Sequence, residues 1–365
     1  MSCYSSNRHN NSREIILLSP LPPPLGGVAS WTKSILEIKG KSFISVDHID
    51  TASKDILPSA SRKNPLIIFK RSTTFLLISL KVIKKKFKNS KRKILHLCTS
   101  GKLGFLKDIL ILILAKSLNM KTIIHLHYGD FQKDYEESNF LKKISGLAFS
   151  LSDRIITIDS NTFSYINKNF KNKSALINNG FNLNYKFKSS FTFNKVIYVG
   201  RIEKAKGSHE LIETYIQYNE KNYIGELTLI GECFDSFLLR KIKHSTNINW
   251  LGKKNREYVI ESLSESSCLI LPSYSEGMPF VVIEAMSLGL PVISSKVGGL
   301  VDLLGKDYPF YLESISKEII LYNLKKFFSE EDLRKNVSLY LRNRYKKYFT
   351  ADKMINELSK LWSKC

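Results

Sequence analysis

Along almost the whole chain, short apolar runs with the character of β-strands alternate with segments long enough to form a helix. Strands that alternate with helices are typical of parallel sheets covered by helices on both faces. Two such series follow one another, separated by a polar stretch without periodicity at residues 182–192. The expected strands are residues 14–19, 43–47, 93–98, 122–127 and 154–158 in the first series, and residues 195–199, 227–231, 247–251, 268–271 and 291–294 in the second.

The two series predict an α/β chain of two doubly wound, Rossmann-like domains that face each other across a cleft. We expect the first domain at residues 1–187 and the second at residues 188–336, with a C-terminal helix within residues 337–365 completing the first. A chain of 365 residues is long enough for two such cores. Ligands of open α/β sheets bind beyond the carboxyl ends of the strands, so the loops after the strands are the places to search for a site.

Neither the apolar runs nor the cysteines indicate a membrane-spanning or secreted protein. The longest apolar run, residues 109–115, is far shorter than the roughly 20 residues that span a bilayer. The apolar run at residues 15–18 is too short for a signal peptide. The five cysteines form no C-x-x-C pair, and Cys98 and Cys268 lie inside apolar runs. We therefore expect a cytoplasmic protein whose cysteines are reduced, with Cys98 and Cys268 buried in the core.

The stretch from residue 271 to residue 299 combines a strand, a polar turn and a helix that we expect to begin near Pro279 or Phe280. The free N–H groups at such a helix start form an anion site suited to a diphosphate. Glu276 and Glu284 are eight positions apart and can both approach one bound molecule, where carboxylates accept hydrogen bonds from sugar or ribose hydroxyls. Taken singly, each glutamate is equally well explained as a helix cap or a solvated helix residue.

Taken together, these residues resemble the signature of family-4 glycosyltransferases, retaining enzymes of the GT-B fold that belong to the glycosyl transferases group 1. The signature reads P-S-x-x-E-G-x-P-x-x-x-x-E-A-x-x-x-G-x-P-V followed by G-G, and every position is met here, up to Gly298-Gly299. The resemblance implies that this stretch holds a nucleotide-sugar donor and that Glu276 is a catalytic residue that orients the donor sugar. The donor-binding residues that it implies here are Gly277, Met278, Pro279, Phe280 and Glu284.

A second match lies in the sequence V-G-R-I-E-K-A-K-G, which contains Arg201 and Lys206 directly after an expected strand. Cations at a strand end can meet phosphates, although two surface cations of a basic protein need no such explanation. The resemblance implies that Arg201 and Lys206 bind the donor diphosphate and stabilise the charge that develops on it. It also implies that Gly231 lies near the nucleotide, although Cys233 stands where the family often has a second glycine.

Glycines and histidines follow strands in the first half. Gly26 and Gly27 come after the first strand, where a plain turn is the simpler explanation, but the resemblance implies that this loop contacts the donor. His125 and His127 lie on one face of a strand, as a metal pair would, but no third ligand with suitable spacing is found. The resemblance implies that His127 lies near the anomeric carbon of the donor sugar and is catalytic. Asp130 is a candidate acceptor contact or a solvated loop residue.

The resemblance implies a hexosyltransferase that uses a nucleotide-sugar donor, which we expect to be a UDP-sugar. No cofactor and no metal are expected, because the chain has no D-x-D motif and the cations of the site balance the diphosphate. The expected acceptor is a saccharide, either free or linked to polyprenyl diphosphate, in the assembly of a bacterial surface polysaccharide such as lipopolysaccharide O-antigen or capsule. The alternative is a GT-B protein that acts by binding alone, without catalysis.

The net charge of +23 is concentrated in the first half of the chain. Residues 1–190 contain 31 basic and 12 acidic side chains, and residues 56–107 contain 14 basic and no acidic ones. Such a surface attracts anionic membranes, and it also attracts nucleic acid without sequence preference. Because no recognition motif for nucleic acid is found, we expect no nucleic-acid partner. We expect the basic surface to hold the protein in a peripheral position at the inner face of the plasma membrane.

Residues 75–93 carry much of this charge and predict a basic amphipathic helix. Leu76, Leu80, Ile83 and Phe87 fall on one face of that helix, with lysines around them. A βαβ unit needs a helix that covers its sheet, so we expect this apolar face to pack on the sheet and only the lysines to meet lipid headgroups.

Overall fold

The computed structural model describes residues 14–22, 26–37, 45–52, 65–88, 92–129, 131–182, 194–218 and 224–365. Contacts within the chain divide it into two compact units. The first comprises Met1–Thr157, Phe163–Ile177 and Ile355–Cys365, and the second comprises Ile158–Thr162 and Asn178–Met354. The boundary that the sequence predicts between residues 187 and 188 lies outside the described residues.

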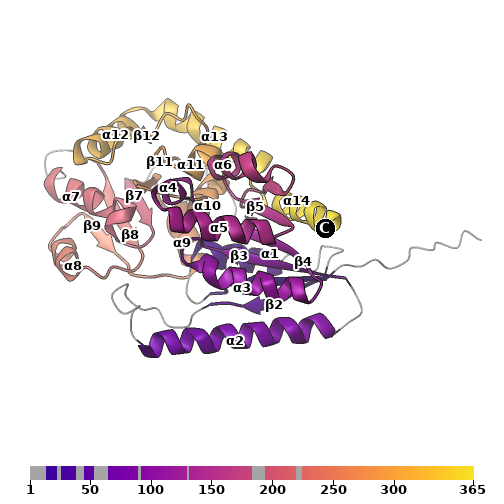
Figure 1. Ribbon diagram of the computed structural model, residues 1–365. Coiled ribbons are helices and arrows are strands. Elements are labelled where there is room, and N and C mark those ends of the chain that lie inside the picture. Colours follow the sequence, from indigo (N-terminus) through magenta and orange to yellow (C-terminus); the bar gives the residue numbers. More distant parts are fainter. Residues whose placement is uncertain are drawn as a thin grey trace, which may run out of the picture. The chain divides into compact units, whose positions relative to one another are not determined.

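A six-stranded parallel sheet forms the centre of the first unit (Figure 1). Its strand order is β2-β1-β3-β4-β5-β6, and every pair of neighbours is parallel. Every residue of β1 and β3 is buried, as expected for strands that helices cover on both faces. The strands are β1 (Glu14–Ser19), β2 (Ser45–Asp50), β3 (Lys93–Thr99), β4 (Lys121–Leu126), β5 (Arg154–Thr157) and β6 (Ser174–Leu176).

The helices of the first unit bury aromatic side chains against this sheet. Phe105, Phe131 and Phe149 come from three different helices and meet with ring centres 5.5, 5.6 and 6.4 Å apart. Two of the helices, α6 and α14, contain residues of both units. The helices are α1 (Gly27–Glu37), α2 (Pro65–Phe87), α3 (Gly104–Ser117), α4 (Phe131–Glu137), α5 (Asn139–Leu151), α6 (Ser160–Phe170) and α14 (Ala351–Lys364).

The second unit has its own parallel sheet, with the strand order β12-β11-β10-β7-β8-β9. From β7 the chain adds β8 and β9 on one side and then β10, β11 and β12 on the other, so the strand order reverses between β7 and β10. Ligands of open α/β sheets bind beyond the carboxyl ends of the strands at such a reversal. The strands are β7 (Lys195–Val199), β8 (Glu226–Ile230), β9 (Ile248–Trp250), β10 (Cys268–Leu271), β11 (Val292–Ser295) and β12 (Tyr311–Leu312).

The helix that follows β10 lies inside the second unit. Eight of the nine residues of α10 are buried, and Glu284 is the only ionisable residue among them. Because α10 packs against α9 and α13, its polar groups must find partners within the protein. The helices are α7 (Ser208–Tyr218), α8 (Ser236–Lys243), α9 (Arg256–Ser264), α10 (Phe280–Leu288), α11 (Gly299–Leu304), α12 (Lys317–Ser329) and α13 (Glu331–Tyr348), with a short 3₁₀ turn at Lys204–Lys206.

The strands expected from the sequence are all present, with ends shifted by up to three residues. The sequence pattern missed β6 and β12, which have three and two residues and therefore no recognisable apolar run. Residues 337–365, in which we expect a C-terminal helix, contain the end of α13 and the whole of α14. Among the described residues, no helix combines the length and the apolar character that crossing a bilayer requires.

The expected packing of the basic amphipathic helix is wrong. Leu76, Leu80 and Phe87 are 59%, 53% and 73% exposed, so the face that they share does not cover the sheet. The helix α2 packs through Ile78 and Val82 instead, which are 6% and 0% exposed. A run with apolar residues on two faces can bury only one of them, and periodicity alone does not choose between them.

Candidate active site

Two loops that carry predicted donor-binding residues leave the same edge of the second sheet. Strands β7 and β10 are parallel neighbours, with Val196 opposite Cys268 and Ile197 opposite Leu269. Arg201 and Lys206 follow β7. The Glu276 loop follows β10, so the residues that sequence reasoning had joined by resemblance meet at the reversal of strand order.

An ion pair joins these two loops directly. The Lys206 ammonium lies 2.8 Å from Oε1 of Glu276, and it also donates to the backbone oxygen of Ser275 at 3.4 Å. The Ser273 hydroxyl donates to the same Glu276 oxygen at 2.7 Å. The side chains of Lys206 and Glu276 are 24% and 11% exposed, so the pair is largely shielded from water. A cation and a carboxylate are thus held together at the strand ends.

Glycine is required where the loops approach each other most closely. Gly207 has φ +61°, and a Cβ placed there would lie 1.9 Å from the backbone oxygen of Pro272. Gly298 has φ +48°, and its Cβ would lie 1.9 Å from the backbone oxygen of Glu276. Both the conformation and the lack of space exclude a side chain. These two positions allow the loops after β7, β10 and β11 to sit against one another.

The start of α10 offers unpaired backbone donors next to Glu276. Pro279 is the N-cap residue in an extended conformation, without a side-chain hydrogen bond to the helix, and the first turn contains no acidic residue. Met278 and Phe280 are 4% and 6% exposed, so their side chains pack inside the unit. Asn179 fixes the backbone here, since its side-chain amide donates to the Met278 oxygen at 2.9 Å. An uncapped helix start of this kind favours an anion.

The second glutamate of the signature is held by an arginine that sequence reasoning did not single out. Arg256 Nε donates to Glu284 Oε1 at 2.8 Å, and their side chains are 14% and 6% exposed. The Arg256 guanidinium lies over the ring of Phe181, 4.0 Å from its centre. Burial raises the pKa of Glu284, while Arg256 opposes that rise. Nothing in the local pattern around Arg256 distinguishes it from the other surface cations, because its partner is 28 residues away.

The remaining predicted donor residues of this unit, Arg201 and Gly231, follow the neighbouring strands β7 and β8. Arg201 is well exposed, with a side chain 60% accessible and an ion pair to Glu203 at 3.0 Å. Gly231 follows β8, and its oxygen accepts a hydrogen bond from the Trp250 indole at 3.0 Å. An isolated parallel bridge joins Ile202 to Cys233, so the residue that replaces the second family glycine ties this loop to the Arg201 loop.

In the first unit, His127 lies at the end of a buried chain of aromatic and imidazole rings. The Trp362 indole donates to His96 Nδ1 at 3.0 Å, and His96 Nε2 lies 3.2 Å from His125 Nδ1. The rings of His125 and His127 stack with centres 4.0 Å apart, and Trp31 of α1 lies 5.0 Å from both. The sequence pair His125–His127 is therefore part of a larger cluster.

The donors and acceptors of this chain fix the proton on two of the histidines. An indole can only donate, so His96 must accept at Nδ1 and carry its proton on Nε2. His125 then accepts at Nδ1 and carries its proton on Nε2, which is buried without a partner among the described residues, as is Nε2 of His127. Burial lowers the pKa of His96 and of His127 to about 3 and lowers that of His125 as well. All three are neutral near pH 7.

His96, Cys98 and His125 are the described residues that lie close enough for a shared metal ion, with possible ligand atoms within 4.8 Å of one another. Of the histidine pair considered in the sequence, only His125 belongs to this group, and His127 does not. The chemistry of this group fits a metal poorly. Burial raises the pKa of the Cys98 thiol well above its usual range, and the facing histidine nitrogens already bond to each other. Metal-independent chemistry remains a prediction.

The other predicted residues of the first unit lie at the start of α1 or outside the description. Gly26 and Gly27 are exposed at the beginning of α1, one turn before the Trp31 that contacts His127. A Cβ at either glycine would meet nothing within 4 Å, so neither is required by packing. Asp130 lies outside the described residues.

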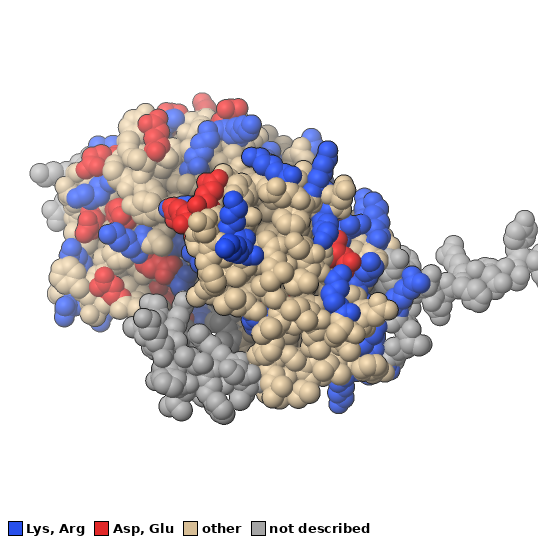
Figure 2. Space-filling view, in the orientation of Figure 1, with Lys and Arg blue, Asp and Glu red and all other residues tan. Residues whose placement is uncertain are grey.

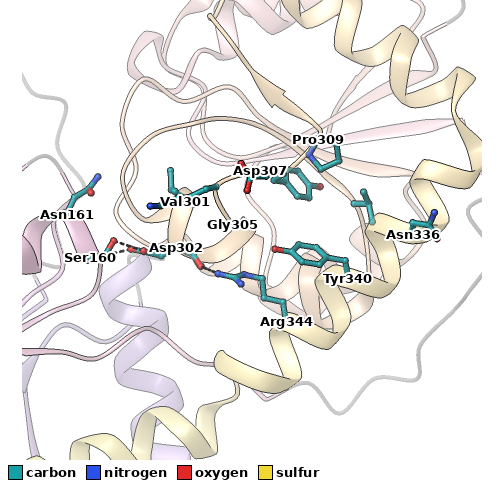
Figure 3. Close-up of a pocket in the computed structure, with 13 residues that line it drawn as sticks. Ser160, Asn161, Val301, Asp302, Gly305, Asp307, Pro309, Asn336, Tyr340 and Arg344 are labelled. Carbon is teal, nitrogen blue, oxygen red and sulfur yellow. Dashed lines mark hydrogen bonds between the residues drawn. The ribbon is translucent and has the colours of Figure 1, made fainter.

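A pocket of about 700 Å³ occurs in the second unit between α11 and α13 (Figure 3). The backbone N–H and the hydroxyl of Ser160 donate to the Asp302 carboxylate at 2.7 and 2.6 Å. Arg344 donates to the backbone oxygens of Asp302 and Leu303 at 2.7 and 2.6 Å. These polar groups already make hydrogen bonds within the protein, and none of the predicted donor residues lines the pocket. We assign it no part in the chemistry.

The sequence of the second unit matches a known family. Residues 183–344 match the model of the family described as glycosyl transferases group 1. An uncharacterized glycosyltransferase of Methanocaldococcus jannaschii is 26% identical over 255 residues, which is 68% of this chain and 70% of that protein. A capsular polysaccharide biosynthesis glycosyltransferase of Staphylococcus aureus is 28% identical over 170 residues. That match covers 46% of this chain and less than half, 45%, of the relative.

Solved structures show the same fold. Sucrose-phosphate synthase from Thermosynechococcus elongatus gives a TM-score of 0.77 at 18% identity, over 96% of this chain and 98% of that one. A pneumococcal O-GlcNAc transferase, solved with UDP and GlcNAc, gives a TM-score of 0.61 at 15% identity, over 78% of this chain and 59% of that one. The predicted fold class, α/β of the GT-B type, is confirmed.

Proposed function

We propose that the chain, whose residues 183–344 match the model of the glycosyl transferases group 1, is a retaining glycosyltransferase that moves a sugar from a nucleotide-sugar donor to a saccharide acceptor. One observation carries the proposal. Arg201, Lys206 and the Glu276 loop converge at the carboxyl ends of β7 and β10, where the strand order reverses. That edge is where an open α/β sheet binds its ligand, and these residues suit a diphosphate and a sugar.

The diphosphate of the donor is the part that this site fits best. Lys206 is held by Glu276 in the shielded pair, Arg201 extends into solvent, and the uncapped start of α10 provides backbone donors. Two cations and a helix N-terminus neutralise an anion whose negative charge grows as the bond to the sugar breaks. No divalent cation is needed for this balance, so we propose metal-independent transfer.

The two glutamates have different roles in this proposal. Glu276 accepts hydrogen bonds from the hydroxyls of the donor sugar, since Ser273 after β10 and Lys206 after β7 hold its carboxylate in place. Glu284 accepts bonds from the ribose hydroxyls, and Arg256 fixes its orientation. A carboxylate whose rotamer is locked loses little freedom when it binds a hydroxyl.

For the reaction itself we propose departure of the diphosphate and attack by the acceptor on the same face of the sugar. The acceptor hydroxyl forms the new bond to the anomeric carbon and gives its proton to an oxygen of the leaving diphosphate, so no side chain needs to act as nucleophile. His127 serves as a neutral hydrogen-bonding group toward the sugar, because burial holds its pKa near 3. Gly26 and Gly27 are proposed to contact the donor through their backbone.

The donor and acceptor classes rest on the relatives. A UDP-sugar is proposed because the pneumococcal transferase of this fold was solved with UDP. A saccharide, free or linked to polyprenyl diphosphate, is proposed as the acceptor in bacterial surface-polysaccharide assembly, since the Staphylococcus aureus relative is named for capsular polysaccharide biosynthesis. An acceptor with a lipid carrier would place the reaction at the inner face of the plasma membrane.

The proposal is tested by a thermal-shift screen against UDP, GDP and their sugars, followed by NMR of the product formed from each ligand that stabilises the protein. We expect stabilisation by a UDP-sugar and a product with the anomeric configuration of the donor. A product of inverted configuration would refute the retaining mechanism. Binding of donors without any turnover would support the alternative of a catalytically silent binding protein.

A further inference from the structure

All exposed large apolar side chains in the described part of the first unit lie on three helices, except for Leu103, which directly precedes α3. On α3 they include Leu106, Leu110 and Ile113, which are 46%, 54% and 50% exposed. The helix α3 packs against both α2 and α5, so the three exposed faces adjoin one another. We call this surface the leucine face; its members are Leu76, Leu77, Leu80, Phe87, Leu103, Leu106, Leu110, Ile113, Phe140 and Leu147.

The leucine face lacks the negative charge that covers other parts of the molecule. The sequences of α2 and α5 contain no Asp or Glu, and the single acidic residue of α3, Asp108, is 1% exposed. Figure 2 shows a broad tan area over α2 and α3 in which no Asp or Glu is seen, bordered by blue Lys and Arg side chains. The exposed lysines beside the apolar residues are Lys81, Lys84, Lys107, Lys142 and Lys143.

A contiguous group of exposed apolar side chains on the surface of a protein indicates a partner. Leu77, Leu80 and Leu110 are each more than half exposed. Apolar side chains that remain in water contribute no hydrophobic stabilisation to the fold. The apolar residues are not needed inside the unit, because Ile78, Val82 and the buried side of α3 already fill its core.

We propose that the leucine face docks the first unit onto an anionic bilayer, with the leucines of α2, α3 and α5 entering the acyl boundary and the surrounding lysines contacting lipid headgroups. The helices lie along the surface and do not cross it, since no described helix is long and apolar enough to span a membrane. Only the biological reason for this docking, which is to hold the enzyme near a lipid-linked acceptor, rests on the proposed function. The docking itself is independent of catalysis.

Charge decides between a bilayer and a second copy of the chain as the occupant. In a symmetric dimer the same patch would face itself, so the lysines of each copy would meet the lysines of the other. The described face offers no exposed carboxylate to neutralise them. An anionic lipid surface supplies that charge, at about tenfold in affinity for every one to two lysines near the headgroups.

Cosedimentation with vesicles tests the proposal directly. The probes are vesicles of equal parts phosphatidylglycerol and phosphatidylcholine, and vesicles of phosphatidylcholine alone. We expect the intact chain to bind the anionic vesicles at least tenfold more tightly at 0.15 M salt, which is an order-of-magnitude expectation for several lysines. The double change Leu106→Gln and Leu110→Gln should weaken binding at least tenfold, and this loss should persist in about 0.5 M salt, where charge is screened.

The matched controls lie in the second unit. Leu339 is 60% exposed there, so Leu339→Gln removes an exposed leucine without touching the leucine face. Lys325→Glu and Lys346→Glu make the same change of charge as Lys81→Glu and Lys84→Glu, at exposed positions away from that face. Binding should fall at least tenfold for the pair in α2 and change less than twofold for the controls, on the same order-of-magnitude basis.

Three results would overturn the proposal. Equal binding to both kinds of vesicle, or none, would remove the bilayer as occupant. If the lysine changes weaken binding to the vesicles and the leucine changes do not, the contact is electrostatic and the leucines do not insert. A dimer in light scattering that the leucine changes dissolve would assign the face to a second copy. Nucleoside diphosphate release from a donor, measured without vesicles, should be unchanged in the leucine variant, so failure of the proposed function would be seen separately.

Discussion

Replacing Arg256 by methionine should destabilise the second unit by about 3 kcal/mol, the lower end of the usual cost of removing one partner from a buried ion pair. Methionine keeps most of the volume of the arginine stem, so the change chiefly leaves the Glu284 carboxylate without its counter-charge. Glu284 is 5% exposed, and the missing partner lay 2.8 Å away in a setting that excludes water. The removal of the guanidinium from the ring of Phe181, 4.0 Å from its centre, adds to the loss.

The cost should depend on pH in a defined direction. Burial raises the pKa of Glu284, so its carboxyl group favours the protonated form in the folded state. Without Arg256, that preference grows, and the stability lost at pH 7.5 should be partly recovered as the pH falls toward the ordinary glutamate value near 4.5. The second change, Glu284→Gln, should restore about half of the loss at pH 7.5, because it removes the unpaired charge.

Urea denaturation followed by circular dichroism at pH 7.5 and pH 5.5 measures these effects, with the midpoint compared at constant m-value. Lys253→Met is the matched control, because the pair of Lys253 with Glu232 has the same distance, 2.8 Å, but side chains 36% and 27% exposed. The control should cost less than about 1 kcal/mol. If Arg256→Met costs no more than Lys253→Met, the buried pair does not hold the second glutamate in the way described.

Three further predictions concern other parts of the molecule. Below pH 6.5 the free energy of unfolding of the first unit should fall by about 1.4 kcal/mol per pH unit for each histidine that the fold keeps neutral. The reason is that His96 has a pKa of about 3 in the folded protein, so the unfolded chain takes up the proton first. A denaturation series from pH 7.5 to 4.5 without any change in stability would contradict this. Gly298→Ala should destabilise the protein by more than about 2 kcal/mol, measured by thermal melting. Gly146→Ala, where a Cβ would meet nothing within 4 Å, should be neutral or stabilising. Equal melting temperatures of the two variants would disprove the close approach of Gly298 to the backbone of Glu276. Lys206→Met should weaken UDP binding in calorimetry about tenfold or more, while Lys204→Met on the same turn should leave it unchanged; equal affinities would remove Lys206 from the diphosphate site.

The repeating order of strands and helices was predictable because it is local. Each strand is a short apolar run between polar turns, and the ten expected strands needed no knowledge of distant contacts. The rule about strand ends pointed to the loops after all the strands, and the resemblance to a family signature singled out those after β7 and β10 before any distance between Lys206 and Glu276 was known. Boundaries shifted by a few residues because helix and strand ends depend on hydrogen bonds that the sequence does not reveal.

The contacts that could not be predicted join residues far apart in the chain. Trp362 bonds to His96 across 266 positions, and nothing near either residue indicates the other. Arg256 reaches Glu284 across 28 positions from an ordinary basic segment. The buried face of α2 was mispredicted for a related reason. Ile78 and Leu80 are equally apolar, and only the neighbouring sheet decides which of them is buried.

Release of nucleoside diphosphate from a panel of UDP- and GDP-sugars, with and without the change Arg201→Ala, measures whether the carboxyl ends of β7 and β10 form the active site. Arg201 is 60% exposed, so its loss should leave the fold intact while it removes a cation from the developing charge of the leaving group. We expect turnover of at least one donor and a fall in kcat/KM of about a hundredfold or more in the variant. Turnover of no donor, or turnover that Arg201→Ala does not change, would contradict the assignment of this strand edge as the active site.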